Sequence, residues 1–349
     1  MSPVAKNKQK IVEILLRNQG QSSDDIYTKL RKIVVKSTVK RYLKDLVDEG
    51  KLQKKGASLA TKYYINPFYG FIAPVSMTKY FNVEIDDREI KDNFNWAVIR
   101  EVIPNQNIIN PQEKKEIEIQ QENFKTQIYS MSKSLYRKEF ERLAIDLSWK
   151  SSQIEGNTYS LLETELLIKD KIEAKGKKKE EAVMLLNHKK ALDYIIENEG
   201  RAIPLKLRDI EDIHSILIKD LDVERNLRIR AVGITGTNYS PIDNEHQIRE
   251  ALQLMCDIIN SKEDVFEKAL LALLLISYIQ PFEDGNKRTA RIISNAILVN
   301  NAYCPISFRT IDPIDYKKAL LIFYEQNNVY NFKKIFMEQF KFATKTYFK

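Results

Sequence analysis

Residues 280–291 read QPFEDGNKRTAR, a compact cluster of acidic, glycine, amide and arginine residues between two apolar runs. The run before it, residues 265–279, is almost wholly apolar and too short to cross a bilayer, so it predicts a buried core helix. The run after it resumes helical spacing from Arg291 onward. We therefore expect the cluster to form the loop between two helices and the first turn of the second helix.

This arrangement favours an anion site. Free backbone N–H groups at a helix start, with Gly285 allowing close approach, form a cradle for phosphate or carboxylate. Arg288 and Arg291 stand three residues apart, which predicts that both guanidinium groups point toward one ligand. Asp284 adds an oxygen ligand of the kind that Mg²⁺ prefers. The residues thus predict a site for a phosphate-bearing ligand.

Residues 280–291 strongly resemble the motif of the Fic (Fido) family, His-x-Phe-x-(Asp/Glu)-Gly-Asn-x-Arg-x-x-Arg. Members of that family mostly transfer AMP from ATP to a protein hydroxyl. The resemblance implies an all-helical core that binds ATP and Mg²⁺, with Asp284 holding the ion. It also implies that Asn286 contacts the α-phosphate and that the two arginines contact the outer phosphates. The residues implied for nucleotide binding are Gly285, Asn286, Lys287, Arg288, Arg291 and, by its position in the last helices, Tyr324.

The residues implied for catalysis are Gln280, Asp284, Asn286 and Arg288, and the first of these departs from the motif. The family's histidine takes the proton of the attacking hydroxyl, whereas glutamine has no titratable nitrogen. Losing a positioned general base typically costs about 10²–10⁴ in rate. We predict a chain that binds nucleotide and is weak or inactive as an AMP transferase. A non-catalytic nucleotide sensor, phosphoryl transfer and AMP removal assisted by Glu155 stay open as alternatives.

Residues 151–157 read SSQIEGN and resemble the family's inhibitory motif, (Ser/Thr)-x-x-x-Glu-(Gly/Asn), on a helix expected around residues 140–157. The regulatory positions are Ser151, Glu155 and Gly156. By this resemblance Glu155 would pair with Arg291 and occupy the place of the ATP γ-phosphate. The electrostatics agree, because a carboxylate and a phosphate compete for the same guanidinium fork. Taken alone, Glu155 would be an ordinary surface acid.

Residues 230–241 read RAVGITGTNYSP, in which apolar residues alternate with small ones before a group of turn formers. The pattern predicts a short β-hairpin. In the Fic family a hairpin here, called the flap, pairs with the target's backbone as an added strand. The positions implied for a protein target are Ile234, Thr235, Gly236 and Thr237. A purely structural hairpin is the alternative.

Metal and thiol chemistry find little support. The three histidines are spread without ligand spacing, and Cys256 and Cys304 lie far apart, so no zinc pattern exists. His246 follows the flap closely and is a second candidate for the missing base. Two cysteines, with neither a signal peptide nor a transmembrane run, lead us to expect a cytoplasmic protein without a membrane partner.

The first 65 residues carry the excess positive charge of the chain. They hold 15 Lys and Arg against 6 Asp and Glu, whereas the other 284 residues hold 41 against 42. A locally basic segment is the expected electrostatic footprint of a nucleic-acid-binding protein. DNA is therefore the expected partner of this end.

The same segment has a specific periodicity. Amphipathic or capped helical patterns cover residues 8–17, 22–30 and 36–47, and strand patterns cover 52–56 and 61–65. Three helices and a two-stranded wing resemble the winged helix-turn-helix, in which a recognition helix enters the major groove and the wing touches phosphates. The residues expected at DNA are Lys36, Ser37, Thr38, Lys40, Arg41, Lys54 and Lys55. Specificity would need paired half-sites, so a homodimer is expected; a protein-docking module or a solvated basic face is the alternative.

The predicted organisation has three parts: a winged helix-turn-helix at residues 1–66, a connector that packs on the core at 67–134, and a Fic domain at 135–349. A strand is expected near residues 80–85. The fold class is mainly α, an all-helical core with a short β-hairpin flap plus the N-terminal winged module. Further helices are expected at residues 135–154, 161–172, 178–198, 204–221, 245–260, 313–324 and 331–347.

Overall fold

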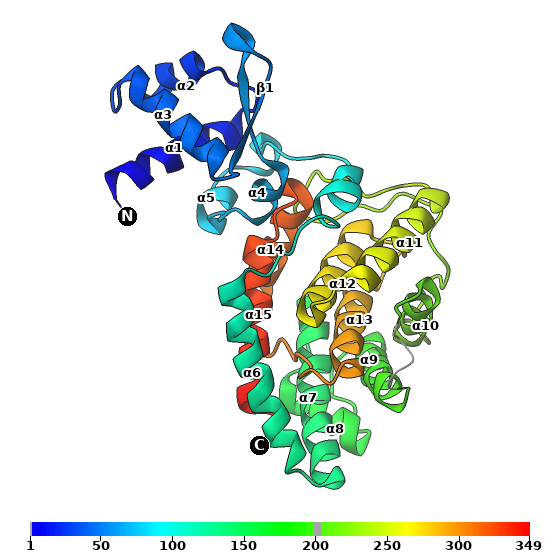
Figure 1. Ribbon diagram of the computed structural model, residues 1–349. Helices are drawn as coiled ribbons and strands as arrows, with labels where there is room; N and C mark the ends of the chain where they lie inside the picture. The colour runs from blue at the N-terminus through cyan, green and yellow to red at the C-terminus, as the bar shows by residue number, and fades with distance from the viewer. Residues whose placement is uncertain (1, 199–203) are drawn as a thin grey trace.

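The computed structural model describes residues 2–198 and 204–349, and Figure 1 shows its arrangement. The chain is mainly helical, and in the described residues one two-stranded antiparallel sheet is the only sheet. The N-terminal helices and this sheet form a small unit at one end, beside a larger stack of long helices. None of the helices in the described ranges is both long enough and apolar enough to cross a bilayer.

Residues 2–66, here called the N-terminal module, contain the three helices and two strands that the sequence predicts. Ser22 caps the second helix, and the Asp25 carboxylate accepts a hydrogen bond from the Ser22 backbone N–H, because a helix start leaves such donors unpaired. In the sheet Leu52 pairs with Ile65 and Lys55 with Lys62. The module has its own hydrophobic core, distinct from that of the larger stack. Its elements are α1 (Pro3–Arg17), α2 (Ser23–Leu30), α3 (Lys36–Asp48), β1 (Leu52–Lys55), a 3-10 turn (Ser58–Ala60) and β2 (Lys62–Ile65).

The larger stack is built around α12, whose side chains are almost all buried, and α13, which returns antiparallel beside it. The expected helices are confirmed, with ends that shift by a few residues. The largest shift is at the pattern of residues 204–221, whose helix covers only Leu207–Leu217. The helices are α7 (Lys133–Ile154), α8 (Leu161–Asp170), α9 (Lys179–Glu197), α10 (Leu207–Leu217), α11 (Glu245–Ser261), α12 (Val265–Ile279), α13 (Asn286–Asn300), α14 (Pro313–Gln326) and α15 (Tyr330–Thr346).

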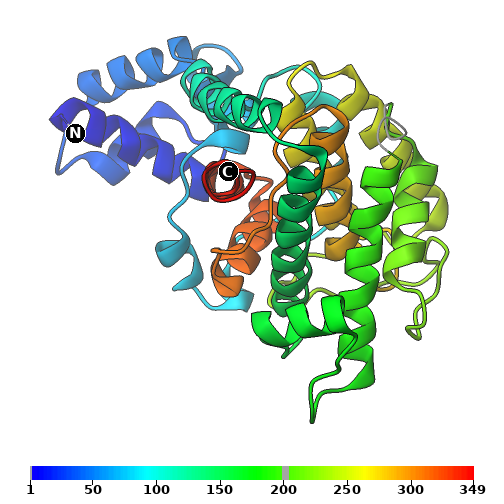
Figure 2. The same cartoon turned by 90° about the horizontal axis from the view of Figure 1, so that it is seen from below.

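The segment between these parts is more ordered than its sequence suggests. It forms α4 (Pro67–Ile72), α5 (Met77–Phe81), a 3-10 turn (Ile85–Asp87), a π-helical turn (Val98–Val102) and α6 (Pro111–Tyr129). α6 packs along α15, and Figure 2 shows α15 end-on between the N-terminal module and the core helices. The expected strand near residues 80–85 is wrong. Ser76 caps a helix there instead, and the helix directs the Tyr80 hydroxyl into the core to bond Glu325.

The hairpin expected at residues 230–241 is also wrong. The segment is a loop with a turn at Thr235–Gly236, where Gly236 has a φ of 91°. Its one bridge joins Ser240 to Asn93, in parallel orientation. The hydrogen-bonding partner of the loop is thus the segment after α5, and no second strand of its own forms within the described chain.

Candidate functional site

The loop between α12 and α13 crosses at the centre of the core. α12 ends where Gln280 adopts a left-handed conformation, with a φ of 50°, and α13 begins after Gly285, with a φ of 81°. A Cβ at Gly285 would also lie 3.3 Å from the His214 ring. Glycine is therefore required at this position both for its conformation and for its space.

Asn286 and Gln280 hold this loop together. The Asn286 side chain accepts from the Phe282 N–H and donates to the Phe282 carbonyl, both at 2.8 Å, and its amide also donates to Gln280 Oε1 at 3.1 Å. Gln280 Nε2 in turn donates to the Ser277 carbonyl at 2.6 Å. The buried Gln280 amide is therefore a structural part of the loop, with both of its polar atoms engaged.

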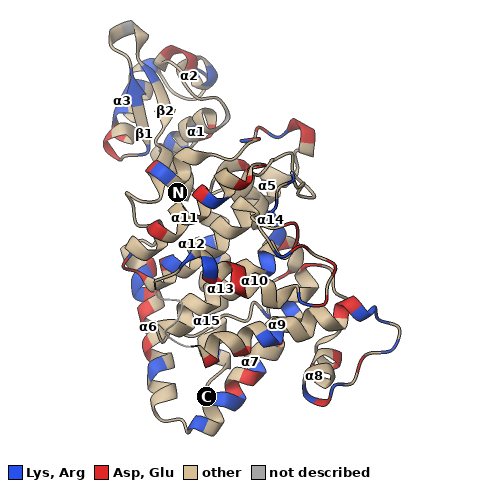
Figure 3. Cartoon of the chain, turned by 90° about the vertical axis from the view of Figure 1, so that its right-hand side faces the viewer, with Lys and Arg blue, Asp and Glu red and all other residues tan. Residues whose placement is uncertain are grey.

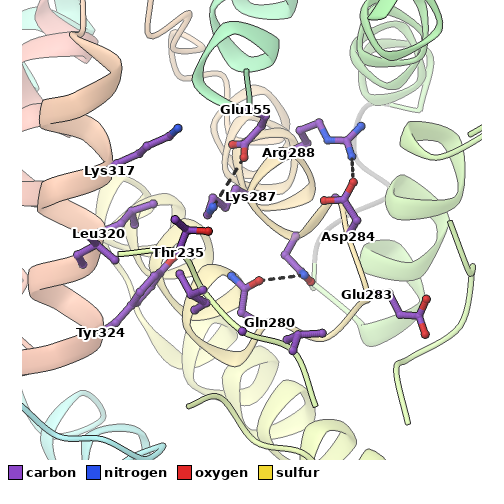
Figure 4. A pocket seen from close by; sticks show the side chains of 16 residues that line it. Glu155, Thr235, Gln280, Glu283, Asp284, Lys287, Arg288, Lys317, Leu320 and Tyr324 are labelled. Atoms are coloured by element: carbon purple, nitrogen blue, oxygen red, sulfur yellow. Dashed lines mark hydrogen bonds and ion pairs between the residues drawn. The ribbon is translucent and has the colours of Figure 1, made fainter. Parts of the chain in front are cut away.

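A pocket of about 300 Å³ opens over this loop, and Figure 4 shows it from close by. Its walls come from four places: the loop and first turn of α13, the end of α7, residues 232–235 and one side of α14. The volume lies at the lower end of the range for small-molecule sites. The lining residues are Glu155, Val232, Gly233, Ile234, Thr235, Gln280, Glu283, Asp284, Gly285, Asn286, Lys287, Arg288, Lys317, Leu320, Leu321 and Tyr324.

The two motif arginines occupy different places. Arg288 lines the pocket with a side chain that is 2% exposed, and its Nη2 donates to Asp284 Oδ2 at 2.8 Å. Within the described chain, its buried Nη1 has no hydrogen-bond partner. Arg291 is fully buried and lies outside the lining residues, behind Glu155. Only Arg288 therefore lines the pocket while Glu155 binds Arg291, and contact of both guanidinium groups with one ligand stays a prediction.

Glu155 follows the last residue of α7 and makes the expected contact with Arg291. Its Oε1 accepts from Arg291 Nη2 at 2.8 Å, and its Oε2 lies 3.7 Å from Lys287 Nζ. Burial by itself would raise the pKa of Glu155, but the charges of Arg291 and Lys287 outweigh burial and hold this pKa below its ordinary value. Glu155 is therefore ionised at neutral pH and partly closes the pocket from the α7 side.

Ser151 and His188 support that ion pair from behind. Ser151 Oγ accepts from Arg291 Nε at 2.8 Å and lies 2.7 Å from His188 Nε2. The Ser151 hydroxyl thus connects the Arg291 guanidinium to the His188 ring. Burial first, and then the Arg291 charge, lower the pKa of His188 well below its ordinary value.

His214 supports the loop from the other side. Its ring stacks on Phe282, with centroids 3.6 Å apart and planes 3° from parallel, and its Nε2 donates to the Asp284 carbonyl at 3.0 Å. Burial lowers the pKa of His214 to about 4. In the sequence both histidines look like ordinary packed residues, because neither belongs to a recognisable motif.

Of the other residues predicted for the site, some line the pocket and others lie outside it. Tyr324 lines the pocket beside Leu320, and burial raises the pKa of its hydroxyl. Of the expected flap positions, Ile234 and Thr235 line the pocket, whereas the next two, Gly236 and Thr237, do not. Gly156, directly after Glu155, has a φ of 101°. His246 is exposed at the start of α11 and outside the lining, so it is not placed to act as the base.

A preformed metal cage is absent from the described residues, since none of them form a group of three metal-ligating side chains. Asp284 is 67% exposed and has one oxygen engaged with Arg288. A single carboxylate with a free oxygen fits a magnesium ion that takes its other ligands from phosphate and water.

The residues expected at DNA lie on α3 and β1, and the basic ones belong to the blue segments at one end of Figure 3. All are exposed except Thr38, which is half-buried. Lys36 makes an ion pair of 2.7 Å with Asp24, and the Lys55 ammonium lies 5.3 Å from the centre of the Tyr64 ring. This face thus combines exposed cations with cations that contact a neighbouring side chain of the module.

Known proteins that resemble this chain are Fic proteins. Residues 204–298 match the family model described as Fic/DOC family. The chain is 29% identical over 177 residues to the protein adenylyltransferase Fic of Nematostella vectensis, which covers 49% of this chain and 41% of that protein. It is 27% identical over 161 residues to the protein adenylyltransferase fic-1 of Caenorhabditis elegans. That match covers 44% of this chain and 31% of the relative. The chain therefore spans less than half the length of these curated relatives.

Solved structures share the fold. Fic-1 (aa134–508) from C. elegans superimposes with a TM-score of 0.59 at 20% identity, over 66% of this chain and 70% of that one. A Fic family protein from Desulfovibrio desulfuricans G20 gives a TM-score of 0.54 at 20% identity, over 68% and 74%. The chain thus has the helical fold of these Fic proteins.

Proposed function

We propose that this chain binds ATP with Mg²⁺ in the pocket over residues 280–291 and derives from protein AMP transferases, with Glu155 as an internal inhibitor and Gln280 as a defective catalytic position. Arg288 carries this proposal, because this guanidinium lines the pocket and its buried Nη1 has no partner in the described chain. Leaving such a group unpaired is costly, so an anionic ligand is its natural partner. The start of α13 directs its free N–H groups at the same space.

The residues then take distinct roles. Arg288 and the first turn of α13 bind phosphate, and Asp284 offers its free oxygen to the magnesium ion. Leu320 and Tyr324 line the side of the pocket that suits the adenine base of the nucleotide. When bound, the ion would neutralise phosphate charge. Glu155 occupies the guanidinium of Arg291, so a γ-phosphate could reach that arginine only by displacing the carboxylate.

Gln280 limits the chemistry. In AMP transfer a target hydroxyl oxygen attacks the α-phosphorus, the bond to the β-phosphate breaks, and pyrophosphate leaves while the hydroxyl proton needs an acceptor. The Gln280 amide is already bonded to Asn286 and to the Ser277 carbonyl and cannot take up that proton. A rate loss of about 10²–10⁴ is expected.

Residues 231–235 are proposed as the segment that receives a protein target. In the described chain, the backbone groups of these five residues make no hydrogen bond to other backbone groups, and their exposure alternates along the segment. An extended target could pair with them as an added strand. Recognition would then depend on extended shape more than on particular side chains.

Four proteins test the proposal: the wild type, Gln280→His, Glu155→Gly and the double variant. Calorimetry with MgATP should show tighter binding, or an altered Mg²⁺ dependence, once Glu155 is removed. Glu283→Ala is the matched control, because Glu283 is an exposed acid of the same pocket that pairs with no arginine in the described chain. Unchanged nucleotide binding in Glu155→Gly would remove the inhibitory role.

Labelled ATP then distinguishes AMP transfer from phosphoryl transfer and from nucleotide binding without transfer. With a cell extract and α-labelled ATP, the double variant should label protein at least about 10²-fold faster than Glu155→Gly alone. Equal rates would refute the defect at Gln280. Label from γ-labelled ATP alone would support phosphoryl transfer, and nucleotide binding without any label would support a sensor.

A nucleotide-sensing DNA-binding regulator is the second candidate, favoured by the exposed cations of α3 and β1. It divides the chain into a DNA-binding module at residues 1–66, a connector at 67–134 and the Fic domain at 135–349. A gel shift with genomic fragments at low salt tests it, and sedimentation tests for the homodimer that paired half-sites require. Absence of any shift at low salt would count against this candidate.

A further inference from the structure

The loop at residues 230–241 and α14 both contribute to the pocket lining and lie beside each other, and a third segment touches both. This segment, residues 80–93, begins with the last two residues of α5 and contributes nothing to the pocket lining. At its centre Arg88 is 8% exposed and binds both carboxylate oxygens of Glu325, at 3.0 and 3.1 Å. Glu325 is 1% exposed and directly follows the pocket residue Tyr324 on α14.

The same guanidinium also reaches the loop. Arg88 Nη2 donates to the Gly236 carbonyl at 3.4 Å, next to the pocket residue Thr235. A Cβ at Gly236 would lie 3.4 Å from Leu321 of α14, so the two walls are close at this point. One buried side chain therefore joins the turn of the loop to the helix that faces it.

Neighbouring contacts strengthen both ends of this connection. Toward α14, the Tyr80 hydroxyl donates to Glu325 Oε2 at 2.5 Å and the Lys91 N–H to the Glu325 carbonyl at 2.8 Å. Toward the loop, the Ser240 N–H donates to the Asp92 carbonyl at 2.7 Å, and the Asn238 side chain donates to Asp86 at 3.0 Å. In contrast, the backbone of residues 231–235 makes no hydrogen bond to other backbone groups in the described chain.

We propose that Arg88 is a positioning residue of the pocket, which fixes residues 230–241 against α14 and so sets the geometry in which ligand and target are held. A buried guanidinium suits this task because its planar fork defines the direction of each hydrogen bond. It also explains why the loop needs no hairpin partner of its own. The contacts of Arg88 with Glu325 and Gly236, here called the tether, exist in the nucleotide-free protein. Their effect on nucleotide binding rests on the proposed function.

Hydrogen exchange of the nucleotide-free full chain tests the tether directly. The amides of Ser240 and Lys91 report on its two ends, since each donates across the contact. In Arg88→Ala we expect both amides to exchange at least about tenfold faster than in the wild type, because the local contact opens more often. Arg88→Lys should recover little, because an ammonium cannot reproduce the fork.

Arg100→Ala is the matched control. Arg100 belongs to the same stretch of chain, pairs with Glu250 while 50% exposed, and does not touch the loop. It should leave exchange at both amides within about twofold. Equal exchange in Arg88→Ala and Arg100→Ala would overturn the proposal. If Arg88→Ala fails to fold, Asp86→Ala, which removes only an exposed contact to Asn238, should still speed exchange at Ser240, and unchanged exchange would overturn the proposal equally.

The functional consequence is measured in the Glu155→Gly background. Adding Arg88→Ala should weaken MgATP binding roughly tenfold, because an unfixed wall must be ordered on binding, whereas Arg100→Ala should not. Faster exchange with unchanged MgATP affinity would leave a tether without a role in the pocket and overturn the positioning role. If no variant binds any nucleotide while exchange still rises, the nucleotide proposal fails and the tether stands.

Discussion

The N-terminal module and the pocket use the same kind of side chain in opposite ways. On α3 the cations stand in water, and Lys36 pairs with Asp24 while the two side chains are 49% and 65% exposed. Around the pocket Arg288 and Arg291 are 2% exposed or less, and both bond to carboxylates. A charge in water attracts partners over a Debye length but fixes no geometry, whereas a buried guanidinium must be paired and therefore defines the position of its partners.

Substitutions in the two sets of cations should therefore have separate effects. Changing an exposed cation should alter association with a charged partner and leave the free energy of unfolding nearly unchanged. Changing a buried one should alter both stability and the shape of the site. Matched variants in the two regions test whether exposure separates the two sets of cations.

The largest effect is expected for Arg291→Ala. Arg291 bonds Ser151, Glu155 and Tyr316 from a fully buried position. Its removal should lower the free energy of unfolding by about 3–5 kcal/mol, measured by urea titration without nucleotide. Arg249→Ala, which removes a half-exposed pair with Glu245, is the control and should cost about 0.5 kcal/mol or less. Similar changes in the two variants would contradict the comparison.

The next effect concerns acid. The pKa of His214 is about 4 in the folded protein against 6.5 ordinarily, so the unfolded chain binds the proton more readily between these values. The stability from neutral His214 is fully present above pH 6.5 and is lost as pH falls toward 4, by up to about 3 kcal/mol. In His214→Gln the fall in stability between pH 7 and pH 4.5 should be much shallower. His246→Gln, at an exposed position, is the control, and an unchanged slope in His214→Gln would refute the prediction.

Much of this fold could be predicted because its strongest patterns are local. The apolar run before Gln280 gives α12, and the serine at position 22 with an acid three residues later gives the start of α2. Both signals depend on neighbours along the chain. The contact between Glu155 and Arg291 was also predictable, although only through resemblance, since nothing local to either residue indicates the other.

The errors have a common physical cause, which is dependence on distant partners. The loop at residues 230–241 has the composition of a hairpin, but its backbone at Ser240 is bonded to Asp92 instead. α6 was missed because its amphipathic stripe is narrow and is buried mainly by the distant helix α15. The roles of His214 and Arg88 follow from contacts with residues 282–284 and with Glu325, which no pattern near either residue encodes.

A smaller effect is expected at the basic face of α3, which we propose binds DNA, and it should leave stability alone. The double variant Lys40→Ala/Arg41→Ala removes two exposed cations of α3. For each phosphate that is no longer neutralised, the slope of log affinity against log salt should fall by about one, and affinity for a duplex at low salt should fall roughly tenfold. Fluorescence anisotropy across a salt series measures both. Arg137→Ala/Lys138→Ala, an equally exposed pair on α7, should change neither, and an equal reduction there would make the attraction a property of overall charge.

The smallest effect is expected for Asp24→Asn, and its sign distinguishes the two uses of charge. Asp24 holds Lys36 in an exposed ion pair, so its removal should change the free energy of unfolding by about 0.5 kcal/mol or less. The same change frees Lys36 and removes a negative charge from the basic face, so duplex affinity at low salt should rise by roughly twofold, and the increase should vanish at high salt. Denaturant titration and anisotropy on one preparation measure the two quantities. If Asp24→Asn instead destabilised the chain as strongly as Arg291→Ala, exposure would not be what separates the two sets of cations, and the basic face would owe its geometry to its ion pairs.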